Sequence, residues 1–249
     1  NIKDLINVFE AAKKKDGPIV IHVVTKKGKG YKPAEEDKNG KWHGVGKFDV
    51  KTGEMLSSIP ENYKTYSQIV ADKVLEIMDR DDRVTAITPA MISGSCMNNM
   101  FAKYPKRCFD VGIAEDHAIT FACGMALEGL RPFVSVYSSF LQRAYDQLNH
   151  DVCRMNLPVV IGVDRCSIIG EDGDSHQGVF DISYMNSLPN MVIAEGKNSS
   201  QIEALLDLAF SQTSPFAIRY PRGSIEYNCD CKCDIALGKW EFVVNNIDS

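Results

Sequence analysis

The chain has 249 residues, 44% of them hydrophobic, and a formal net charge of −5 at pH 7. This composition can fill a core, and the sequence has no basic stripe or arginine-rich arm to favour a nucleic-acid partner. Its longest apolar runs, such as residues 157–163, are far shorter than the ~20 residues that a membrane span needs. The first residues do not resemble a signal peptide, so we expect a protein that acts in the cytoplasm.

The first 60 residues predict a helix, a strand and a long connection. Apolar residues recur at helical spacing between Ile2 and Ala12. Residues 19–24 form a continuous apolar run, which is typical of a strand buried in a parallel sheet. From residue 25 to about 60 the chain is rich in charge and glycine, which indicates a linker or a functional loop. We therefore expect residues 1–60 to be the end of a preceding domain followed by a linker.

Residues 61–225 alternate predicted helices and strands, which indicates an α/β fold. Helices are expected from residue 66, from residue 115, over residues 140–152 and after the capping residue Asn198. Strands are expected at residues 84–88, 109–111, 133–137, 159–164, 191–194 and 216–220. This alternation predicts one mostly parallel sheet with helices on both faces. Residues 226–249 are expected to begin a linker to a further domain.

Polar side chains gather where the predicted strands end. They are Glu115, Arg143, Arg165, Asp172, His176 and Arg222. Open parallel sheets bind ligands at the carboxyl ends of their strands, and forked guanidinium donors suit phosphate or carboxylate groups. His176, and His43 in the glycine-rich connection, suit proton transfer or binding of an oxyanion. Taken singly, each arginine could serve a salt-bridge network, each histidine could be an ordinary surface residue, and Glu115 could be a first-turn residue favoured by the helix dipole.

The eight cysteines do not predict a metal site. Most are scattered through apolar or loop contexts and are expected to be free thiols. Cys229, Cys231 and Cys233 alternate, but they lack paired C-x-x-C spacing and nearby histidines. Gly170-Glu-Asp-Gly173 superficially resembles a magnesium-diphosphate motif, yet no Gly-Asp-Gly triplet occurs in the chain. We predict no metal ligands within this sequence.

Several longer stretches carry a family resemblance. They are Thr25-Lys-Lys-Gly-Lys-Gly-Tyr-Lys-Pro-Ala-Glu35, Trp42-His43, Ile87-Thr-Pro-Ala-Met91, Val111-Gly-Ile-Ala-Glu-Asp-His117, Tyr137-Ser-Ser-Phe-Leu-Gln-Arg-Ala-Tyr-Asp-Gln147, Asp172-Gly-Asp-Ser-His-Gln-Gly178 and Arg219-Tyr-Pro-Arg-Gly223. Together they resemble the 1-deoxy-D-xylulose-5-phosphate synthase family of the transketolase superfamily. The resemblance covers essentially the whole chain. The stretches from Phe140 and from Asp172 are specific to this family, whereas Gly-Ile-Ala-Glu marks only the superfamily.

The resemblance implies an enzyme that uses thiamine diphosphate to condense pyruvate with glyceraldehyde 3-phosphate, releasing carbon dioxide. The product would feed isoprenoid, thiamine and pyridoxal synthesis. Glu115 would hydrogen-bond the pyrimidine nitrogen of the cofactor, and His43 and His176 would be catalytic residues near its thiazolium ring. The remaining implied roles are cofactor contacts for Phe140, Met91, Ile113 and Lys27, and substrate binding for Tyr137, Arg143, Arg165, Asp172 and Arg222.

The resemblance also implies how the chain is divided. Residues 1–60 would be the end of the diphosphate-binding domain with its linker, residues 61–225 the pyrimidine-binding domain, and residues 226–249 the start of a linker to a third domain. The Mg²⁺ ligands would lie outside this chain, so we expect it to be inactive alone. A homodimer is expected from the family.

The chain departs from the family pattern at a few positions. Asp116 stands where glutamine is expected, and Ser167 stands where glycine is expected. A second carboxylate at position 116 could raise the pKa of Glu115 if it faces the site. Two other functions stay open: a subunit of a split transketolase-like enzyme with another ketose donor, and a non-catalytic interaction module that kept the fold.

Overall fold

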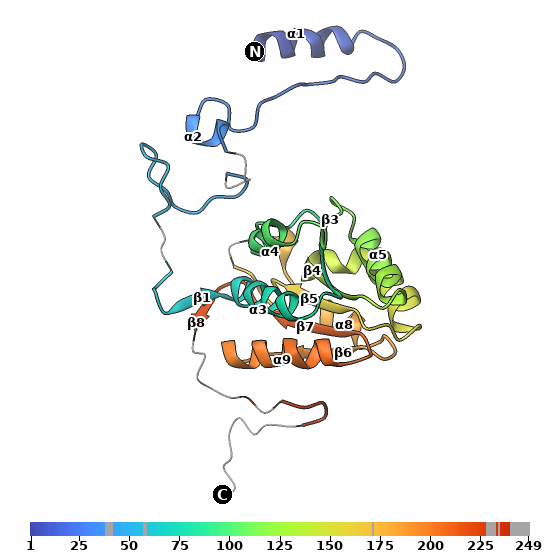
Figure 1. Cartoon of the computed structure of the whole chain (residues 1–249). Coiled ribbons are helices and arrows are strands. Elements are labelled where there is room, and N and C mark those ends of the chain that lie inside the picture. Colours follow the sequence, from blue (N-terminus) through green and yellow to red (C-terminus); the bar gives the residue numbers. More distant parts are fainter. Residues whose placement is uncertain (38–41, 57–58, 171, 228–232, 234, 240–249) are drawn as a thin grey trace, which may run out of the picture. The chain divides into compact units, whose positions relative to one another are not determined.

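The computed structural model describes residues 1–37, 42–56, 59–170, 172–227, 233 and 235–239. The chain divides into two compact units, Asn1–Ser57 and Ser58–Ser249 (Figure 1). No helix in the described ranges is both long and apolar enough to cross a membrane. Cys229 and Cys231 fall outside these ranges, and Cys233 is a free thiol.

The N-terminal unit contains two short helices, α1 (Ile2–Ala12) and α2 (Lys32–Glu35). Helix α1 starts as predicted, because the Asn1 side chain accepts a hydrogen bond from the Lys3 backbone N–H at 3.1 Å. None of the α1 residues is buried. A small aromatic cluster forms around Trp42, whose ring centroid lies 5.0 Å from that of Tyr31 and 4.8 Å from that of Phe48.

The strand predicted over residues 19–24 is wrong. This segment has no regular secondary structure, and Val20 and Val24 are 95% and 83% exposed. The described residues of this unit form only an isolated bridge, between Phe48 and Met55, and no strand. An apolar run becomes a strand only where neighbouring strands satisfy its backbone groups, and none is available here.

The second unit confirms the predicted α/β fold. Its six-stranded sheet has the order β3-β2-β4-β5-β7-β6, and every neighbouring pair is parallel. The strands are β2 (Val84–Thr88), β3 (Cys108–Asp110), β4 (Arg131–Tyr137), β5 (Val160–Asp164), β6 (Val192–Glu195) and β7 (Phe216–Tyr220). Tyr137 pairs with Asp164, and Asp164 with Tyr220, so these three strands end at one level. The residues that follow them therefore meet at one edge.

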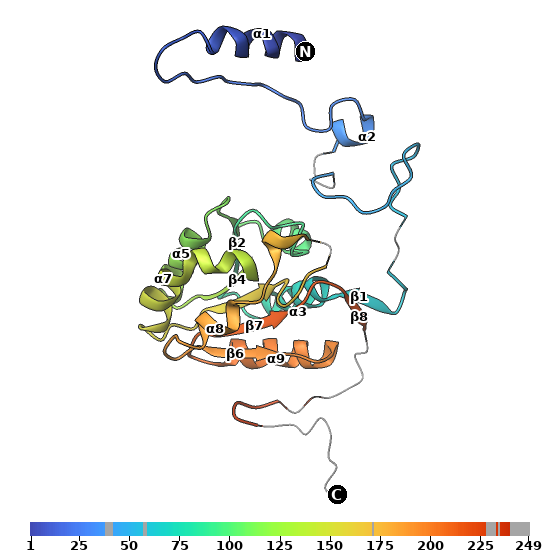
Figure 2. The same ribbon diagram turned by 180° about the vertical axis from the view of Figure 1, so that it is seen from behind.

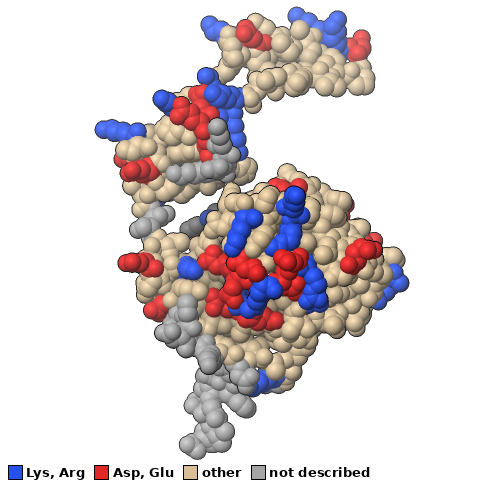
Figure 3. Space-filling model, viewed as in Figure 1, with Lys and Arg blue, Asp and Glu red and all other residues tan. Residues whose placement is uncertain are grey.

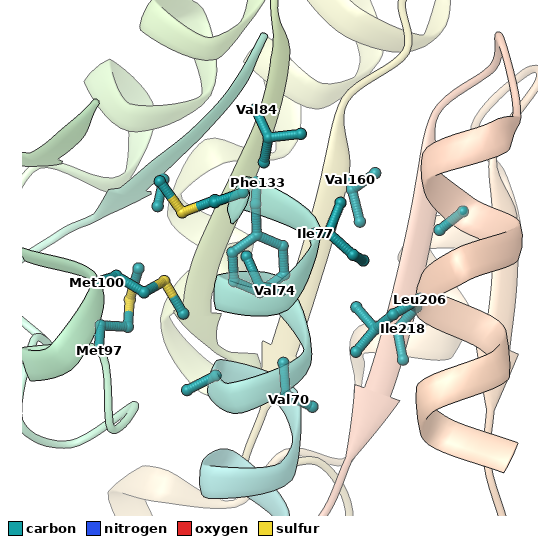
Figure 4. Close-up of a cluster of buried hydrophobic side chains, with 14 of the residues drawn as sticks. Val70, Val74, Ile77, Val84, Met97, Met100, Phe133, Val160, Leu206 and Ile218 are labelled. Carbon is teal, nitrogen blue, oxygen red and sulfur yellow. The ribbon is translucent and has the colours of Figure 1, made fainter. Parts of the chain in front are cut away.

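Helices cover both faces of the sheet (Figure 2). Helices α3 (Tyr66–Arg80), α4 (Asn98–Lys103) and α9 (Ser199–Ser211) pack on one face. Figure 4 shows the resulting core, with Val74 and Ile77 of α3 near Phe133 of β4, and Leu206 of α9 near Ile218 of β7. Helices α5 (Glu115–Leu127) and α8 (Asp181–Met185) pack on the other face.

The helix predicted over residues 140–152 is present but irregular. It runs through α6 (Ser138–Leu141), the 3-10 turn η1 (Gln142–Ala144), α7 (Tyr145–Gln147) and the π-turn η2 (Leu148–Cys153). Its apolar side chains, including Leu141, Leu148 and Val152, are fully buried against the sheet. Apolar spacing predicted the buried face but not the changes in winding, which are common near functional sites.

A two-stranded antiparallel ribbon lies outside the main sheet. It pairs β1 (Tyr63–Thr65) with β8 (Ser224–Glu226), so residues from the start and the end of this unit lie side by side. Thr65 also caps α3, since its hydroxyl accepts the Gln68 backbone N–H at 3.1 Å. The sequence did not indicate this ribbon, because three-residue strands carry no clear period.

Candidate functional site

Glu115 is the first residue of α5 and its carboxylate is buried, at 4% exposure. The turn before it is held by Asp110, whose Oδ1 accepts the backbone N–H groups of Ala90 at 2.8 Å and Gly112 at 2.9 Å. Gly112 has φ +71°, a conformation that favours glycine. The turn therefore aims a carboxylate inward at the positive end of a 13-residue helix. Asp116 is exposed instead.

Glu115 is paired with Arg143, which comes from η1 on the next helical segment. Arg143 Nη1 lies 3.2 Å from Glu115 Oε1. The same guanidinium lies 5.2 Å from the centre of the Phe140 ring, within cation–π distance. Phe140 also contacts the His176 ring edge to face, at 5.1 Å between centroids. A carboxylate, a cation, an aromatic face and an imidazole are thus contiguous.

The contacts continue from Phe140 to the ends of β4, β5 and β7. The Phe140 and Tyr137 rings stack at 5.8 Å, and the Arg165 guanidinium lies 4.0 Å from the centre of the Tyr137 ring. Arg165 Nη1 contacts Asp172 Oδ2 at 2.6 Å, and Arg222 pairs with the other oxygen of Asp172. Burial raises the pKa of the Tyr137 hydroxyl to about 12, so it is a hydrogen-bond donor at neutral pH.

A pocket of about 480 Å³ opens beside the paired arginines. Its lining includes Thr65, Ser67, Cys96, Arg165, Ile169 and Arg222. Gly94 closes one wall, where an added Cβ would lie 1.9 Å from the Tyr137 hydroxyl oxygen. The pocket thus combines two cations with hydroxyl and apolar groups. This combination suits a small anionic ligand with a short carbon skeleton.

A buried hydrogen bond behind this pocket was not predicted from the sequence. Ser67 Oγ donates to Asp164 Oδ2 at 2.9 Å, and Asp164 is fully buried at the end of β5. Burial raises the pKa of Asp164 to about 6, opposed by the Ser67 hydrogen bond and the Arg165 charge. Ser67 belongs to no motif, and its partner lies 97 residues away.

Lys27 and His43 are both in the N-terminal unit, where they lie together. Lys27 Nζ is 2.6 Å from His43 Nδ1, and both side chains are exposed. The nearby Glu35 carboxylate accepts the Gly30 backbone N–H at 2.8 Å and pairs with Lys26 at 2.8 Å. These contacts fold the glycine-rich Thr25–Gly30 stretch into a compact turn. Two of the predicted site residues, a cation and an imidazole, thus lie together within this unit.

Three residues of the predicted motifs do not take part in the series of contacts that runs from Glu115 to the pocket. Met91 is buried in the core cluster against which Phe140 packs. Ile113 is 81% exposed on the turn before α5. Arg219 is buried and makes a bidentate ion pair with Asp181, at 2.7 and 3.2 Å. Arg222, not Arg219, is therefore the arginine that this strand end delivers to the pocket.

The described residues contain no group of three or more His, Cys, Asp or Glu side chains placed to hold a metal ion. The carboxylates of Glu115 and Asp172 are engaged with arginines instead. The arrangement can bind a planar ring against Phe140 beside a carboxylate, and an anion beside Arg165 and Arg222.

The fold and this edge of the sheet define a ligand-binding α/β domain with a doubly covered parallel sheet. The chain belongs to the family described as "Transketolase, pyrimidine binding domain", which matches residues 62–227.

Full-length relatives are 1-deoxy-D-xylulose-5-phosphate synthases. The chain is 47% identical over 252 residues to the synthase of Listeria monocytogenes serotype 4b (strain CLIP80459), covering 100% of this chain and 41% of that protein. It is 51% identical over 241 residues to the synthase of Clostridium tetani (strain Massachusetts / E88), covering 97% and 38%. The chain therefore spans about 40% of the length of these relatives.

Solved structures support the same fold. A protein described as "Split gene transketolase, inactive beta4 tetramer" aligns with a TM-score of 0.59 and 26% identity, over 68% of this chain and 56% of that one. A transketolase from Pichia stipitis in complex with sedoheptulose 7-phosphate aligns with a TM-score of 0.58 and 14% identity, over 64% and 26%. At 14% identity the second likeness concerns the fold alone.

Proposed function

We propose that this chain supplies the pyrimidine-binding part and the acceptor pocket of a 1-deoxy-D-xylulose-5-phosphate synthase. The reaction joins pyruvate to glyceraldehyde 3-phosphate with loss of carbon dioxide. The observation that carries the proposal is the unbroken series of contacts from Glu115 through Arg143, Phe140 and Tyr137 to the arginine-lined pocket. The identity of 47% to a synthase over the whole chain supports the choice of reaction.

The residues of this edge fit the pyrimidine end of thiamine diphosphate. A buried carboxyl group at a helix start can share a proton with a ring nitrogen, and the half-buried Phe140 ring offers a face for stacking. The bound cofactor supplies the electron sink on which an α-keto acid loses carbon dioxide. Glu115 would hold the proton shared with the ring nitrogen, while Arg143 orients the carboxylate.

The arginines beside the pocket would hold the phosphate of the acceptor. Arg165 is fixed by the Tyr137 ring and by Asp172, so its forked donors are already oriented. Tyr137 would donate its hydroxyl hydrogen to the acceptor. His176, in contact with Phe140, would serve proton transfer between the two reacting groups. Lys27 and His43 would serve the diphosphate and the donor substrate.

The same proposal extends to the whole enzyme. It takes residues 1–60, 61–225 and 226–249 as parts of three successive domains, with Mg²⁺ bound by residues outside this chain. It also takes the working form to be a cytoplasmic homodimer. The chain alone should then show no turnover with thiamine diphosphate, Mg²⁺ and both substrates.

A chimeric enzyme tests the proposal. Residues 1–249 would replace the matching region of the Listeria monocytogenes synthase, and formation of 1-deoxy-D-xylulose 5-phosphate would be measured. We expect turnover in the chimera, and a fall in kcat of about 10²–10⁴-fold in the Glu115→Gln variant, the range for loss of a proton-transfer group. Asp116→Asn is the matched control, because that carboxylate is exposed. Equal turnover of the Glu115→Gln variant would remove Glu115 from the mechanism.

The same chimera tests the alternative that the chain is a subunit of a split transketolase-like enzyme. The likeness to the split gene transketolase motivates this alternative. A ketose phosphate would replace pyruvate as the donor. Turnover with the ketose phosphate and none with pyruvate would assign the chain to that second reaction.

A further inference from the structure

One hydroxyl group in the lining of the arginine-lined pocket, that of Ser67, is held in a fixed direction by a hydrogen bond to a buried carboxylate. Thr65, Ser67 and Ser224 line the pocket. A hydroxyl group has one hydrogen to donate and two lone pairs that accept. Ser67 Oγ donates its hydrogen to Asp164 Oδ2 at 2.9 Å. Toward the pocket Ser67 can therefore act only as an acceptor while Asp164 is ionised.

The other hydroxyl groups in the lining are not constrained in this way. Thr65 Oγ1 uses a lone pair to accept the Gln68 N–H at 3.1 Å and lies 4.0 Å from Cys96 Sγ, so no carboxylate fixes the direction of its hydrogen. Ser224 is exposed on β8. Ser67 is the one of the three that faces a buried carboxylate. Its orientation is thus fixed by the protein before a ligand arrives.

An acceptor-only group cannot bind a phosphate group at neutral pH, because the phosphate oxygens are acceptors as well. The phosphate must therefore go to Arg165 and Arg222, which line the same pocket. What Ser67 can bind is a donor, and the donor that a short phosphorylated carbon chain carries is a hydroxyl group.

We propose that Ser67, oriented by Asp164, accepts a hydrogen bond from a hydroxyl group of a phosphorylated ligand and so selects hydroxylated phosphate esters over deoxy ones. This specificity role rests on the proposed function in taking the pocket as the acceptor site. Asp164 is a positioning residue in this arrangement. A deoxy ligand would bind less tightly, because it would leave the Ser67 oxygen without a hydrogen-bond donor.

Two phosphate esters that differ by one hydroxyl group test the proposal on the full 249-residue chain. Dissociation constants of propane-1,2-diol 1-phosphate and n-propyl phosphate would be measured by NMR titration. We expect the diol ester to bind about fivefold tighter, as the loss of one neutral hydrogen bond predicts. In Ser67→Ala the preference should disappear while the affinity for n-propyl phosphate stays within about twofold.

Two further variants make the result specific. Ser224→Ala removes a hydroxyl from the same pocket that has no carboxylate behind it, and should keep the preference. Asp164→Asn places an amide that can donate to Ser67, which frees the Ser67 hydrogen and should reduce the preference although the hydroxyl remains. Circular dichroism and thermal unfolding would confirm that each variant folds.

Failure of the acceptor-site assignment and failure of the proposed role of Ser67 would give different results. If neither ester binds the unmodified chain, the pocket is not a phosphate site, and the acceptor assignment falls together with the role of Ser67. If both esters bind equally well, or if the preference survives Ser67→Ala, only the role of Ser67 is overturned. A parallel loss of both affinities in Ser67→Ala would show a structural role and would equally overturn it.

Discussion

Residue conformations after β5 give one departure from the family sequence an energetic cost. Arg165 has φ +56° and Ser167 has φ +69°, the left-handed region that L residues adopt at a cost of roughly 1–2 kcal/mol. The backbone groups of Ser167 are bonded to Gly178 at 2.6 and 2.9 Å, which holds the strained turn in place. Glycine, which the family pattern led us to expect at position 167, would adopt this conformation without strain.

Ser167→Gly should therefore stabilise the chain. Relief of the left-handed strain contributes roughly 1–2 kcal/mol, and the greater unfolded-state entropy of glycine offsets roughly 0.5–1 kcal/mol of it. Chemical denaturation should show a net gain of about 0.5–1 kcal/mol in the free energy of unfolding. Ser167→Ala keeps the strain and should not be stabilising. A gain of the same size in both variants would show that relief of backbone strain at position 167 is not the cause of the stabilisation.

Asp164 should make the stability of the chain depend on pH. Its pKa is about 6 in the folded state against 3.8 ordinarily, so the folded state binds more protons between these values. Stability from this group is therefore present below pH 3.8 and is lost as the pH rises through 6. The two pKa values correspond to roughly 3 kcal/mol.

The Asp164→Asn variant isolates this contribution from other titrating groups. The neutral amide keeps the shape and removes the buried charge. Denaturation at pH 4 and pH 7.5 should show the variant gaining stability relative to the parent chain at the higher pH, by roughly 2–3 kcal/mol. A gain that is the same at both pH values would contradict a titrating Asp164. Ser67→Ala should raise the pKa of Asp164 further, because the Ser67 hydrogen bond lowers it.

At the scale of elements, a buried ion cluster ties α8 and β6 to β7. Arg219 of β7 makes a bidentate pair with Asp181 of α8 and a further pair with Glu195 of β6. Asp181 and Arg219 are 1% and 5% exposed, whereas the Glu195 side chain is 44% exposed. The cluster joins segments that meet only in the folded chain, and it leads into the strand end that carries Arg222.

Asp181→Ala should destabilise the chain by about 3–5 kcal/mol, because it leaves Arg219 buried with only the half-exposed Glu195 as a partner. Arg80→Ala is the control, since Arg80 belongs to the interspersed charges on the outer face of α3 and α9 (Figure 3). Exposed pairs of this kind contribute about 0–1 kcal/mol. Comparable losses in the two variants, measured by denaturation, would contradict a special role for the buried cluster.

Elements with strong periodicity were predictable and those that depend on partners were not. The six strands of the main sheet were expected within a few residues of their positions, because buried parallel strands read as continuous apolar runs. The run at residues 19–24 has the same composition, yet it is not a strand, because strand formation depends on neighbours that composition does not reveal.

The candidate site was likewise predictable only in part from the sequence. Motifs at strand ends located Glu115, Arg165 and Arg222, because parallel strands deliver their carboxyl ends to one edge. Sequence order could not show that Arg219 turns inward to Asp181, nor that Ser67 meets Asp164 across 97 positions. Such pairings are set by packing of side chains from distant segments, which leaves no local period to detect.

At the scale of the whole molecule, the stability of the α/β unit should not depend on residues 1–57. Both buried core clusters consist of residues from Tyr66 onward, and the ribbon of β1 and β8 closes within the same unit. The N-terminal helix α1 buries none of its side chains. A chain that comprises residues 59–249 should therefore fold, with a free energy of unfolding within about 1 kcal/mol of that of the full chain for this unit.

A second truncation provides the contrast. A chain that begins at residue 67 lacks β1 and the Thr65 cap of α3, and should lose about 1–2 kcal/mol from the cap alone. Urea denaturation monitored by far-UV circular dichroism compares the three chains, because most of the helix and sheet signal comes from this unit. A loss on removal of residues 1–58 as large as that on removal of β1 would contradict the prediction.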